Sequence, residues 1–496
     1  MQLAALLADV DVLAHRGRLD VDVRRIVSDS RAVEPGDVFV CLPGYRTEGG
    51  ETRADRHDFI PAAVERGARA VVVSRDLTPI DGVTVVGVAD CWTAIAAMAC
   101  RYFQNPSRAL HMVGVTGTSG KTSTTYFIES VLRAAGLRTA RLGTVEYRIA
   151  DEVMPAVQTT PEAPEVQRLL RLAVDRGVAA AVMEVSSHAL ELRRVAGVAF
   201  DVAVFTNLSR DHLNFHPDMH HYLRAKGRLF EELASGGKRA TAVVNIDDPA
   251  SAHIIDVNRG QLLTVGTHAA ALVRAQHMSM SVRGVRFAAE TPAGPLEVQL
   301  RHLGEYSVYN ALAAIGSGLA LGVSLDDIHA GLTATPPVPG RFELVECGQD
   351  FGVVVDYAHK PDALERLLTS ARRLGPRRVI TVFGCGGDRD RGKRPVMGEI
   401  AARLSDVAIV TSDNPRSEDP EAIIADIVRE VSGAAAERLH TEPDRARAIE
   451  RAIAFAERDD LVVIAGKGHE TYQLFADRRI DFDDREVART ALRRRG

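Results

Sequence analysis

The sequence of 496 residues lacks the features by which nucleic-acid-binding and membrane-spanning proteins are usually recognised. Its formal net charge is −5, which leaves no basic excess to neutralise the phosphates of a nucleic acid. It has no apolar run of about 18 residues, the length that a membrane-spanning helix needs. Aromatic residues are scarce at 5% while hydrophobic residues reach 46%, a balance typical of a soluble globular enzyme. We therefore expect neither a nucleic-acid partner nor insertion into a membrane.

Cysteine is also scarce, and its spacing excludes two common kinds of site. The five cysteines include no C-x-x-C pair: Cys41, Cys91, Cys100, Cys347 and Cys385. An odd number of scattered thiols supports neither a disulfide framework nor a zinc site. The first residues, MQLAALLADVDVLAHRG, have no basic lead before their apolar part, so we expect an amphipathic helix rather than a signal peptide. The expected location is the reducing cytoplasm, with each cysteine a small buried hydrophobic residue.

Apolar runs that fit buried strands alternate with helical segments along most of the chain, without internal repeats. Examples are ARAVVVS, HMVGVTG, AAAVMEV, FDVAVFTNL, FGVVVDYA, RVITVFG, DVAIVTSD and LVVIAGKG. Such strands are typical of parallel sheets with helices on both faces. A chain of this length is expected to hold two to four domains. Breaks at FQNPSRALH (103–111) and at the proline-rich ATPPVPGRFE (334–343) predict three α/β domains, over residues 1–107, 108–336 and 337–496.

The stretch VGVTGTSGKTST, residues 113–124, has the order strand, glycine loop, lysine, helix. In that order, backbone N–H groups and a helix N-terminus surround phosphate oxygens, the lysine adds a positive charge, and the next hydroxyl ligates Mg²⁺. The usual pattern G-x-x-x-x-G-K-[ST] needs glycine where this chain has Val115. The stretch therefore predicts nucleotide binding by Lys121 and Thr122 in a central, mostly parallel sheet of the phosphate-loop type, and the variant spelling indicates a particular subfamily.

Polar residues after two later strands could hold the magnesium ions of a bound nucleotide. Glu184 closes the apolar run of AAAVMEVSSHAL, where a carboxylate is costly unless a cation compensates it. Asp211 and His212 follow the strand of VFTNLSRDHLNFH, and Lys226 lies on the helix after it. Each residue alone would more often be structural, but together, after a phosphate loop, they predict a magnesium site. Donors suited to an anionic substrate lie close by: Ser186, His188, Arg193 and Arg194.

In the last domain, four apolar runs are each followed at once by polar residues. These are DYAHKP (356–361), GCGGDRDRGKRP (384–395), SDNPRSEDP (412–420) and AGKGHE (465–470). Because ligands bind beyond the carboxyl ends of the strands in an open parallel sheet, the four loops predict a binding face. No G-x-G-x-x-G with a following strand-end acid is present, so the expected likeness to a Rossmann sheet is architectural only.

With these stretches assembled, the chain resembles the Mur ligases, the ATP-dependent amide-forming enzymes of peptidoglycan precursor synthesis. The resemblance covers essentially the whole length and rests on GTSGKTS, TTPEAPEVQ, MEVSSHAL, NLSRDHLNFH, YLRAKGRLF, YSVYNALAA, PGRFE, DYAHKP, GCGGDRDRGKRP, DNPR and AGKGHE. It is most similar to the members that add diaminopimelate to UDP-N-acetylmuramoyl-L-alanyl-D-glutamate. The resemblance implies that residues 1–107 bind the UDP-sugar, 108–336 bind ATP and 337–496 bind the amino acid. A monomer acting in cell wall synthesis is expected.

The resemblance also implies roles for individual residues. The catalytic set would be Lys121, Glu184, His212 and Lys226. ATP would lie at Gly117, Thr118, Ser119, Gly120, Lys121, Thr122 and Ser123, with Asn310, Arg341 and His359 approaching it. Mg²⁺ would lie at Thr122, Glu184, His212 and Lys226, which in the family carries a carbamate. The UDP end of the substrate would contact Ser28, Ser30, Tyr45, Arg46 and Thr47, and its muramoyl-dipeptide end Thr159, Thr160, Ser186 and Arg194.

The implied reaction starts when the D-Glu side-chain carboxylate attacks the γ-phosphate of ATP, and the amine of the amino acid then displaces phosphate from the acyl phosphate. The motif DNPR indicates diaminopimelate, expected in the meso form. Arg416, assisted by Arg389, can clamp the carboxylate at its far end, whereas lysine or ornithine would bring an ammonium toward the guanidinium. The expected amino-acid site comprises Arg389, Asp413, Asn414, Pro415, Arg416, Gly466 and Glu470.

Three positions depart from the family pattern, and three alternatives stay open. Ser119 and Gln158 stand where asparagine is common, and Arg56 stands where glycine is common. The alternatives are a ligase for lysine or ornithine, a relative of folylpolyglutamate synthetase, and a non-catalytic nucleotide-sugar sensor. DNPR and the N-terminal SDSR…PGDVFV region argue against the second, and the intact catalytic set argues against the third.

Overall fold

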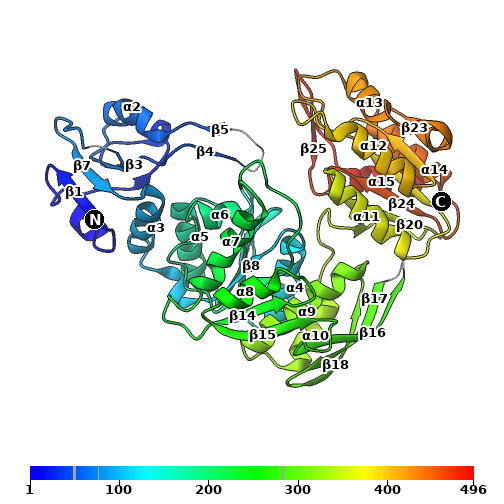
Figure 1. Ribbon diagram of the computed structural model, residues 1–496, viewed down its shortest axis with the longest axis horizontal. Coiled ribbons are helices and arrows are strands. Elements are labelled where there is room, and N and C mark those ends of the chain that lie inside the picture. Colours follow the sequence, from blue (N-terminus) through cyan, green and yellow to red (C-terminus); the bar gives the residue numbers. More distant parts are fainter. Residues whose placement is uncertain (48–51, 76, 282–283, 496) are drawn as a thin grey trace. The chain divides into compact units, whose positions relative to one another are not determined.

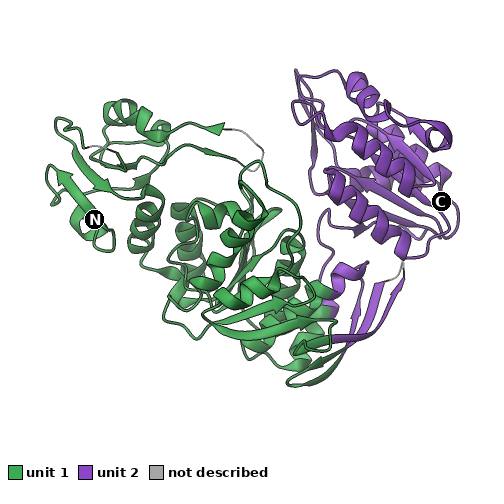
Figure 2. Cartoon of the chain, viewed as in Figure 1, with its two compact units in different colours: residues 1–274, 289–296, 309–332 green, residues 275–288, 297–308, 333–496 purple. Residues whose placement is uncertain are grey.

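The computed structural model describes residues 1–47, 52–75, 77–281 and 284–495, which form two compact units (Figure 2). The first unit comprises residues 1–274, 289–296 and 309–332, and the second comprises 275–288, 297–308 and 333–496. Three separate sheets carry the site residues.

The first sheet has five strands in the order β1-β7-β6-β3-β2 (Figure 1). They are β1 (Val12–Arg16), β2 (Ile26–Val27), β3 (Val38–Val40), β6 (Ala70–Val73) and β7 (Thr84–Val88). All are parallel except β1, which pairs antiparallel with β7. The helices are α1 (Leu3–Leu6), α2 (Ile60–Glu65) and α3 (Cys91–Tyr102), and β4 (Tyr45–Arg46) and β5 (Thr52–Arg53) form a separate hairpin. Helix α3 is capped by Asp90, whose carboxylate accepts the N–H groups of Trp92 and Thr93.

The second sheet has eleven strands in the order β11-β10-β9-β12-β8-β13-β14-β15-β16-β17-β18. They are β8 (His111–Thr116), β9 (Thr139–Leu142), β10 (Glu146–Ile149), β11 (Glu152–Pro155), β12 (Ala180–Glu184), β13 (Val202–Phe205), β14 (Thr241–Asn245), β15 (Gln261–Gly266), β16 (Val273–Ser281), β17 (Gly284–Thr291) and β18 (Gly294–Leu300). From β9 to β16, neighbouring strands in this order are parallel. Its helices are α4 (Lys121–Ala134), α5 (Ala163–Asp175), α6 (Ser187–Glu191), α7 (Met219–Glu231), α8 (Ser251–Val257), α9 (Glu305–Ala320) and α10 (Leu325–Ala334).

Strand β8, which leads into the glycine loop, lies between β12 and β13. Val115 pairs with Glu184 on one side, and Thr116 pairs with Phe205 on the other. The carboxyl ends of all three strands therefore meet at one edge, where ligands bind in parallel sheets.

The third sheet has six strands in the order β19-β20-β24-β21-β22-β23. They are β19 (Glu343–Leu344), β20 (Gly352–Asp356), β21 (Val379–Phe383), β22 (Val407–Val410), β23 (Leu439–Thr441) and β24 (Leu461–Ala465), and β25 (Tyr472–Leu474) and β26 (Arg479–Asp481) form a hairpin. One face packs on α11 (Pro361–Arg373), α12 (Lys393–Leu404) and α13 (Pro420–Val428), and the other on α14 (Arg445–Phe455) and α15 (Asp484–Arg495). Strands β20, β24, β21 and β22 are parallel, so the four polar loops share one edge, as expected.

The predicted fold class is confirmed: the chain has the three-domain α/β fold with mainly parallel sheets. The three sheets fall within residues 1–107, 108–336 and 337–496, and those domain boundaries stay a prediction. The expectation of an amphipathic first helix was wrong in part. Helix α1 has only four residues, and the following segment becomes β1 because it pairs with β7.

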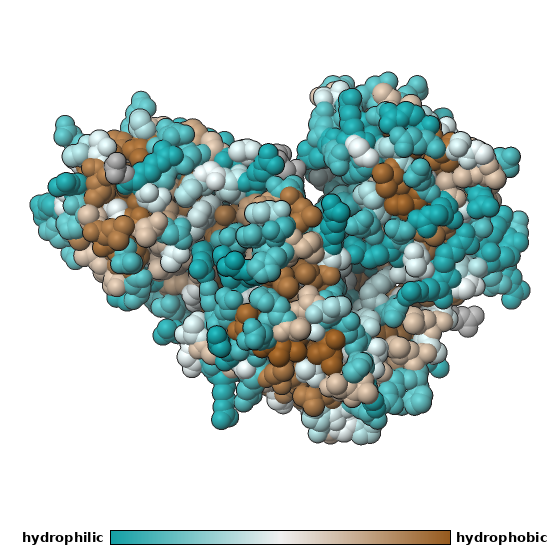
Figure 3. Space-filling view, viewed as in Figure 1, coloured by the Kyte–Doolittle hydropathy of each residue, from teal (hydrophilic) through white to brown (hydrophobic). Residues whose placement is uncertain are grey.

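The cysteine expectation holds for four of the five thiols, and Cys347 is exposed. On the face shown in Figure 3, hydrophobic residues occur in small groups among hydrophilic ones. Within the described ranges, no helix combines the length and apolar character needed to cross a membrane.

Candidate active site

The glycines of the phosphate loop are required by space and backbone conformation. Gly117 has φ +147°, and a Cβ there would lie 1.9 Å from Oγ1 of Thr206. Gly120 has φ +86° and directly precedes α4, so the loop turns into the helix through a left-handed residue. The α4 helix begins at Lys121 and its N–H groups face the loop, the arrangement that binds phosphate.

Residues after the neighbouring strand β13 hold this loop in place. The backbone N–H of Thr118 donates to the carbonyl of Asn207 at 2.9 Å, and the N–H of Ser119 donates to Oδ1 of Asn207 at 2.9 Å. The hydroxyl of Thr206 donates to the carbonyl of Ser119 at 2.7 Å. Sequence reasoning missed Thr206 and Asn207, although the polar pair directly after an apolar strand was a signal.

Two lysine ammonium groups lie at the loop. Nζ of Lys121 donates to the carbonyls of Gly117 and Thr118, both at 2.9 Å. Nζ of Lys226, a buried side chain on α7, donates to the carbonyl of Gly117 at 2.7 Å and lies 4.4 Å from the ring centre of Tyr222. The structure therefore brings Lys121 and Lys226 together on one backbone carbonyl.

Glu184, at the end of β12, is 1% exposed and its carboxylate accepts three hydrogen bonds. Oε2 accepts the hydroxyls of Thr122 at 3.0 Å and Thr144 at 3.1 Å, and Oε1 accepts the N–H of Thr144 at 2.7 Å. Gly143 leaves room for the carboxylate, because a Cβ there would lie 2.4 Å from Oε1. Thr144 and Gly143 were not anticipated, since nothing in their local sequence marks them.

His212 lies in the loop after β13 with φ +55°. Its ring centre lies 5.0 Å from that of His188 and 5.9 Å from that of Tyr222. Tyr222 in turn shares a hydrogen bond of 3.0 Å with the hydroxyl of Thr118. Through Tyr222, His212 is thus linked to the phosphate loop, which Lys226 also contacts.

Asn310, on α9, was predicted to approach the nucleotide and lies beside the loop. Its Oδ1 accepts the hydroxyl of Thr124 at 3.0 Å, and a Cβ on Gly120 would lie 3.0 Å from the same oxygen. Ser123 lies in the first turn of α4.

The residues predicted for the muramoyl-dipeptide end form one group around the end of β12. The hydroxyl of Thr160 donates to the carbonyl of Glu184 at 2.9 Å and accepts the N–H of Ser186 at 3.1 Å. The hydroxyl of Thr159 lies 3.1 Å from that of Thr144. The Arg194 guanidinium donates to the carbonyl of Thr160 at 3.0 Å.

The N-terminal sheet meets this group through Glu162, which sequence reasoning missed. Arg56, the residue that departs from the family pattern, pairs with Glu162 at 2.9 Å, and the hydroxyl of Ser28 donates to the same carboxylate at 2.9 Å. Burial raises the pKa of Glu162, but the Arg56 charge and these hydrogen bonds outweigh burial and hold that pKa below its usual value. Nη2 of Arg194 lies 3.4 Å from the Tyr45 hydroxyl.

The other residues predicted for the UDP end lie in the same N-terminal part of the chain. Ser30 is buried at the start of a short 3₁₀ helix, Arg46 is exposed at the end of β4, and Thr47 follows it. Their role toward UDP stays a prediction.

In the second unit, Arg416 and Arg389 flank Gly386. Nη1 of Arg416 donates to the carbonyl of Gly387 at 2.8 Å, and Nη1 of Arg389 donates to the carbonyl of Asp388 at 3.1 Å. A Cβ on Gly386 would lie 2.8 Å from Nη1 of Arg416 and 3.9 Å from Cγ of Arg389. Within the described ranges, neither guanidinium is paired with a carboxylate, so both charges can be used to bind an anionic group.

A second polar group in this unit joins the loops after β22 and β24. Nδ2 of Asn414 donates to Oε2 of Glu470 at 2.9 Å, and Lys467 donates to both residues. Gly466 has φ +118°, and a Cβ there would lie 3.0 Å from Oδ2 of Asp413. Pro415, which lies between Asn414 and Arg416, is buried. Sequence reasoning missed Lys467.

Arg341 and His359 lie near Tyr357, at the end of β20 in the second unit. The Arg341 guanidinium carbon lies 4.9 Å from the ring centre of Tyr357, and Nδ1 of His359 lies 2.8 Å from the carbonyl of Tyr357. Burial lowers the pKa of His359 to about 4, so its imidazole is neutral near pH 7.

Comparison with known proteins identifies the family. Three family descriptions match: "Mur ligase family, catalytic domain" over residues 22–101, "Mur ligase middle domain" over 115–318, and "Mur ligase, glutamate ligase domain" over 340–468. The UDP-N-acetylmuramoyl-L-alanyl-D-glutamate–2,6-diaminopimelate ligase of Geobacillus kaustophilus is 45% identical over 500 residues, covering 100% of both chains.

Solved structures agree. A structure of UDP-N-acetylmuramoyl-L-alanyl-D-glutamate–2,6-diaminopimelate ligase is 33% identical with a TM-score of 0.73, covering 100% of this chain and 99% of that chain. The folylpolyglutamate synthase of Mycobacterium tuberculosis, 19% identical with a TM-score of 0.60, covers 75% of this chain and 91% of its own, and shares the fold alone. The chain therefore belongs to the Mur ligase family.

Proposed function

We propose a reaction course and residue roles for this Mur ligase. The chain is an ATP-dependent acid–amino-acid ligase that adds diaminopimelate to UDP-N-acetylmuramoyl-L-alanyl-D-glutamate in peptidoglycan synthesis. In the proposed course, the D-Glu side-chain carboxylate attacks the γ-phosphorus of ATP and ADP leaves. The amine of diaminopimelate then attacks the acyl carbon, the tetrahedral intermediate expels phosphate, and the amine loses its proton.

The contact between Thr122 and Glu184 carries the proposal for the first step. It joins the loop proposed to hold the phosphates to the strand end around which Thr160 and Ser186 gather. The γ-phosphate and the D-Glu carboxylate would therefore be held close together, and phosphoryl transfer depends mainly on such positioning and on neutralisation of charge. Lys121 would supply positive charge to the β- and γ-phosphates.

Glu184 and Thr122 fit Mg²⁺, because both offer hard oxygen atoms and these lie 3.0 Å apart. When bound, Mg²⁺ would neutralise charge on the phosphoryl oxygens. His212 is the third proposed ligand and Lys226, as a carbamate, the fourth.

The ligand types support the carbamate. Among the residues that the structure describes, three metal-ligating His, Cys, Asp or Glu side chains come together only at the exposed Asp218, His220 and His221. Glu184 and His212 would thus need a ligand of another type, which the Lys226 carbamate supplies. NMR of enzyme incubated with ¹³C-labelled bicarbonate should show a carbamate signal that is absent in Lys226→Ala. No difference between the two proteins would refute the modification.

Arg416 carries the proposed selectivity for diaminopimelate in its meso form. With no carboxylate partner among the described residues, its guanidinium can form two parallel hydrogen bonds with the distal carboxylate, and Arg389 can assist. Glu470 would receive the distal ammonium, with Asn414 beside it. Arg341 and His359 stay predicted nucleotide contacts. We also propose a cytoplasmic monomer, because both nucleotide substrates are cytoplasmic and one chain supplies every proposed residue.

A substrate panel tests the proposal. Phosphate release is expected only when ATP, the UDP-dipeptide and meso-diaminopimelate are all present, with much weaker use of LL-diaminopimelate, lysine and ornithine. Equal use of lysine would refute the role of Arg416. Complete absence of phosphate release with every amino acid would favour the nucleotide-sugar sensor instead.

A further inference from the structure

Lys467 is a fully buried lysine that the proposed reaction does not use. It lies in the loop after β24 and its side chain is 0% exposed. Its Nζ lies 3.1 Å from Oδ1 of Asn414, 3.2 Å from Oε2 of Glu470 and 3.6 Å from Oδ1 of Asp413. A buried ammonium is costly unless it is paired, and here an amide oxygen and two carboxylates surround it.

The lysine determines which way the Asn414 amide points. Oδ1 of Asn414 accepts hydrogen bonds from Nζ of Lys467 and from the backbone N–H of Leu474 at 3.0 Å. With its oxygen held by two donors, the amide turns its nitrogen toward Oε2 of Glu470, at 2.9 Å. Both side-chain hydrogen bonds of Glu470 fall on Oε2, so among the described residues Oε1 is left to accept a substrate donor.

The side chains of Asp413, Glu470 and Lys467 together carry a single negative charge. Asp413 and Glu470 contribute two negative charges, and Lys467 contributes one positive charge. The nearby Arg445 does not alter this sum, because it is paired with Asp484 at 2.7 Å and both side chains are fully buried. One uncompensated carboxylate matches one ammonium group of a substrate.

Two glycines bring the backbone close enough for this arrangement. Gly466 and Gly468 flank Lys467 and have φ of +118° and +53°. A Cβ on Gly468 would lie 2.6 Å from Cβ of Tyr357, and one on Gly466 would lie 3.0 Å from Oδ2 of Asp413. The sequence GKG is therefore what allows a lysine to enter between the two carboxylates.

We propose that Lys467 is a positioning residue for diaminopimelate, which orients Asn414 and neutralises one of the two carboxylates, so that Glu470 presents one negative charge to a substrate ammonium. This inference rests on the proposed function. It predicts that Lys467 affects the KM for diaminopimelate and not the KM for ATP or the UDP-dipeptide. A general contribution to folding would not be selective in this way.

The proposal predicts a pH signature for Lys467→Met. Without the ammonium, the like charges of Asp413 and Glu470 repel each other, and uptake of a proton by one of them relieves that repulsion. Protonation then removes the charge that receives the substrate, so the ratio of the KM for diaminopimelate in the variant to that in the wild type should increase as the pH falls from about 9 to about 6.5. The other charged or titratable groups that interact with the pair or lie beside it are Arg341, Tyr357, His359, Cys385, Lys393, Arg416, Arg445, Tyr472, Arg479 and Asp484.

Most of these other groups do not change charge in that range, and a change that occurs in both proteins, such as that of Lys393, whose pKa burial lowers, cancels in the ratio. The arginines stay protonated and Asp484 is paired with Arg445. Burial raises the pKa of Tyr357 to about 12 and also raises that of Tyr472. A KM ratio that depends on pH would therefore report the loss of the Lys467 ammonium beside Asp413 and Glu470.

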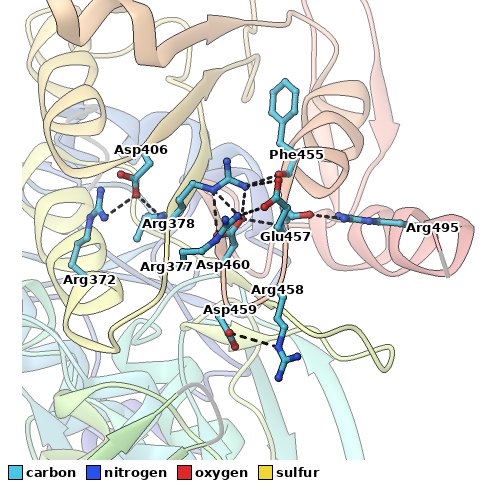
Figure 4. A network of polar contacts seen from close by, with 12 residues as sticks. Arg372, Arg377, Arg378, Asp406, Phe455, Glu457, Arg458, Asp459, Asp460 and Arg495 are labelled. Carbon is cyan, nitrogen blue, oxygen red and sulfur yellow. Dashed lines mark hydrogen bonds and ion pairs between the residues drawn. The ribbon is translucent and has the colours of Figure 1, made fainter.

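The experiment measures the KM for each of the three substrates in wild type, Lys467→Met and a matched control. The control is Arg378→Gln at the opposite end of β24, where Arg378 and Arg377 pair with the fully buried Asp460 at 2.6 and 3.0 Å (Figure 4). It also removes a cation from a buried carboxylate of the same sheet, but away from the substrate loops.

Lys467→Met should raise the KM for diaminopimelate at least about tenfold, with the KM for ATP and for the UDP-dipeptide changed less than about twofold. Arg378→Gln should change none of the three KM values by more than about twofold, whatever it does to thermal stability. If Lys467→Met does not fold, Lys467→Gln, which keeps an N–H donor but no charge, replaces it and must show the same selective increase. An unchanged KM for diaminopimelate, an equal increase for all three substrates, or a pH-independent ratio would overturn the proposal. If the wild type itself does not use diaminopimelate, the proposed function fails instead.

Discussion

Arg416→Ala is the substitution that tests substrate selection most sharply. Arg416 has φ +53°, a conformation that costs alanine no more than arginine, and its backbone N–H bond to the carbonyl of Leu474 at 2.9 Å is kept by alanine. The side chain loses two hydrogen bonds from Nη1, to the carbonyls of Gly387 at 2.8 Å and of Asn414 at 3.5 Å. The effect on folding should thus be small, and the main loss should be the interaction with the distal carboxylate.

The size of that loss follows from the hydrogen-bond donors of Arg416 that remain available. One nitrogen of Arg416 is used by Gly387, which leaves donors for two hydrogen bonds to a carboxylate. A hydrogen bond to a charged group contributes about 1.5–3 kcal/mol, so losing one to the distal carboxylate corresponds to an increase of about 10- to 150-fold in the KM for diaminopimelate. Arg416→Lys keeps the charge without the planar guanidinium, so its KM for diaminopimelate should lie between those of the wild type and Arg416→Ala.

The assay is phosphate release at saturating ATP and UDP-dipeptide with diaminopimelate varied. Arg391→Ala is the control, because Arg391 lies in a neighbouring loop, is 70% exposed and pairs with Glu418 at 2.8 Å. It should leave the KM within about twofold of the wild-type value. A KM for diaminopimelate that is unchanged in Arg416→Ala, or raised equally in Arg391→Ala, would refute the reasoning.

Three further substitutions test other parts of the account. Glu184→Gln should lower kcat at least about 100-fold while the protein stays folded, because the amide can still bond Thr144; near-normal kcat would contradict its role at the metal. Lys226→Ala should be nearly inactive and partly rescued by short carboxylates, whereas full activity without them would exclude the carbamate. Glu162→Gln should lower the free energy of unfolding by about 1–3 kcal/mol at pH 7. Because the folded-state pKa of Glu162 is lowered, this contribution is present above the unfolded pKa of about 4.3 and is lost as pH falls through the folded value. The difference in urea unfolding between wild type and variant should therefore shrink as the pH is lowered below about 4.3.

The strands at the site, though not their order in the sheet, were largely predictable from the sequence. Apolar runs such as VGVT and VVIA leave no polar face, which identifies buried parallel strands, and each is followed by the polar residues of a carboxyl-edge loop. Glu184 could be identified as a candidate metal ligand because a carboxylate at the end of such a buried strand needs a cation to compensate its charge. In the structure Glu184 pairs with Val115 near the end of β8, so its carboxylate lies beside the start of the phosphate loop.

The contacts that complete the site could not be predicted. Asn207, Thr144 and Glu162 are joined to their partners across 40 or more residues, as in Thr144 to Glu184 and Glu162 to Arg56 and Ser28. The sequence around each residue does not reveal a partner that lies so far away along the chain. Lys467 was missed for a different reason: a lysine between two glycines is typical of a surface turn, and its burial depends on carboxylates from another loop.

The most direct test of the account follows the oxygen atoms of the D-Glu side chain. UDP-N-acetylmuramoyl-L-alanyl-D-glutamate labelled with ¹⁸O in that carboxylate would be incubated with ATP and meso-diaminopimelate. The masses of the phosphate and peptide products would then be measured by mass spectrometry. Transfer of the γ-phosphoryl group to the carboxylate predicts one ¹⁸O atom in the released phosphate and a product that contains diaminopimelate. Unlabelled phosphate would contradict the acyl phosphate, and no peptide product would contradict the ligase itself.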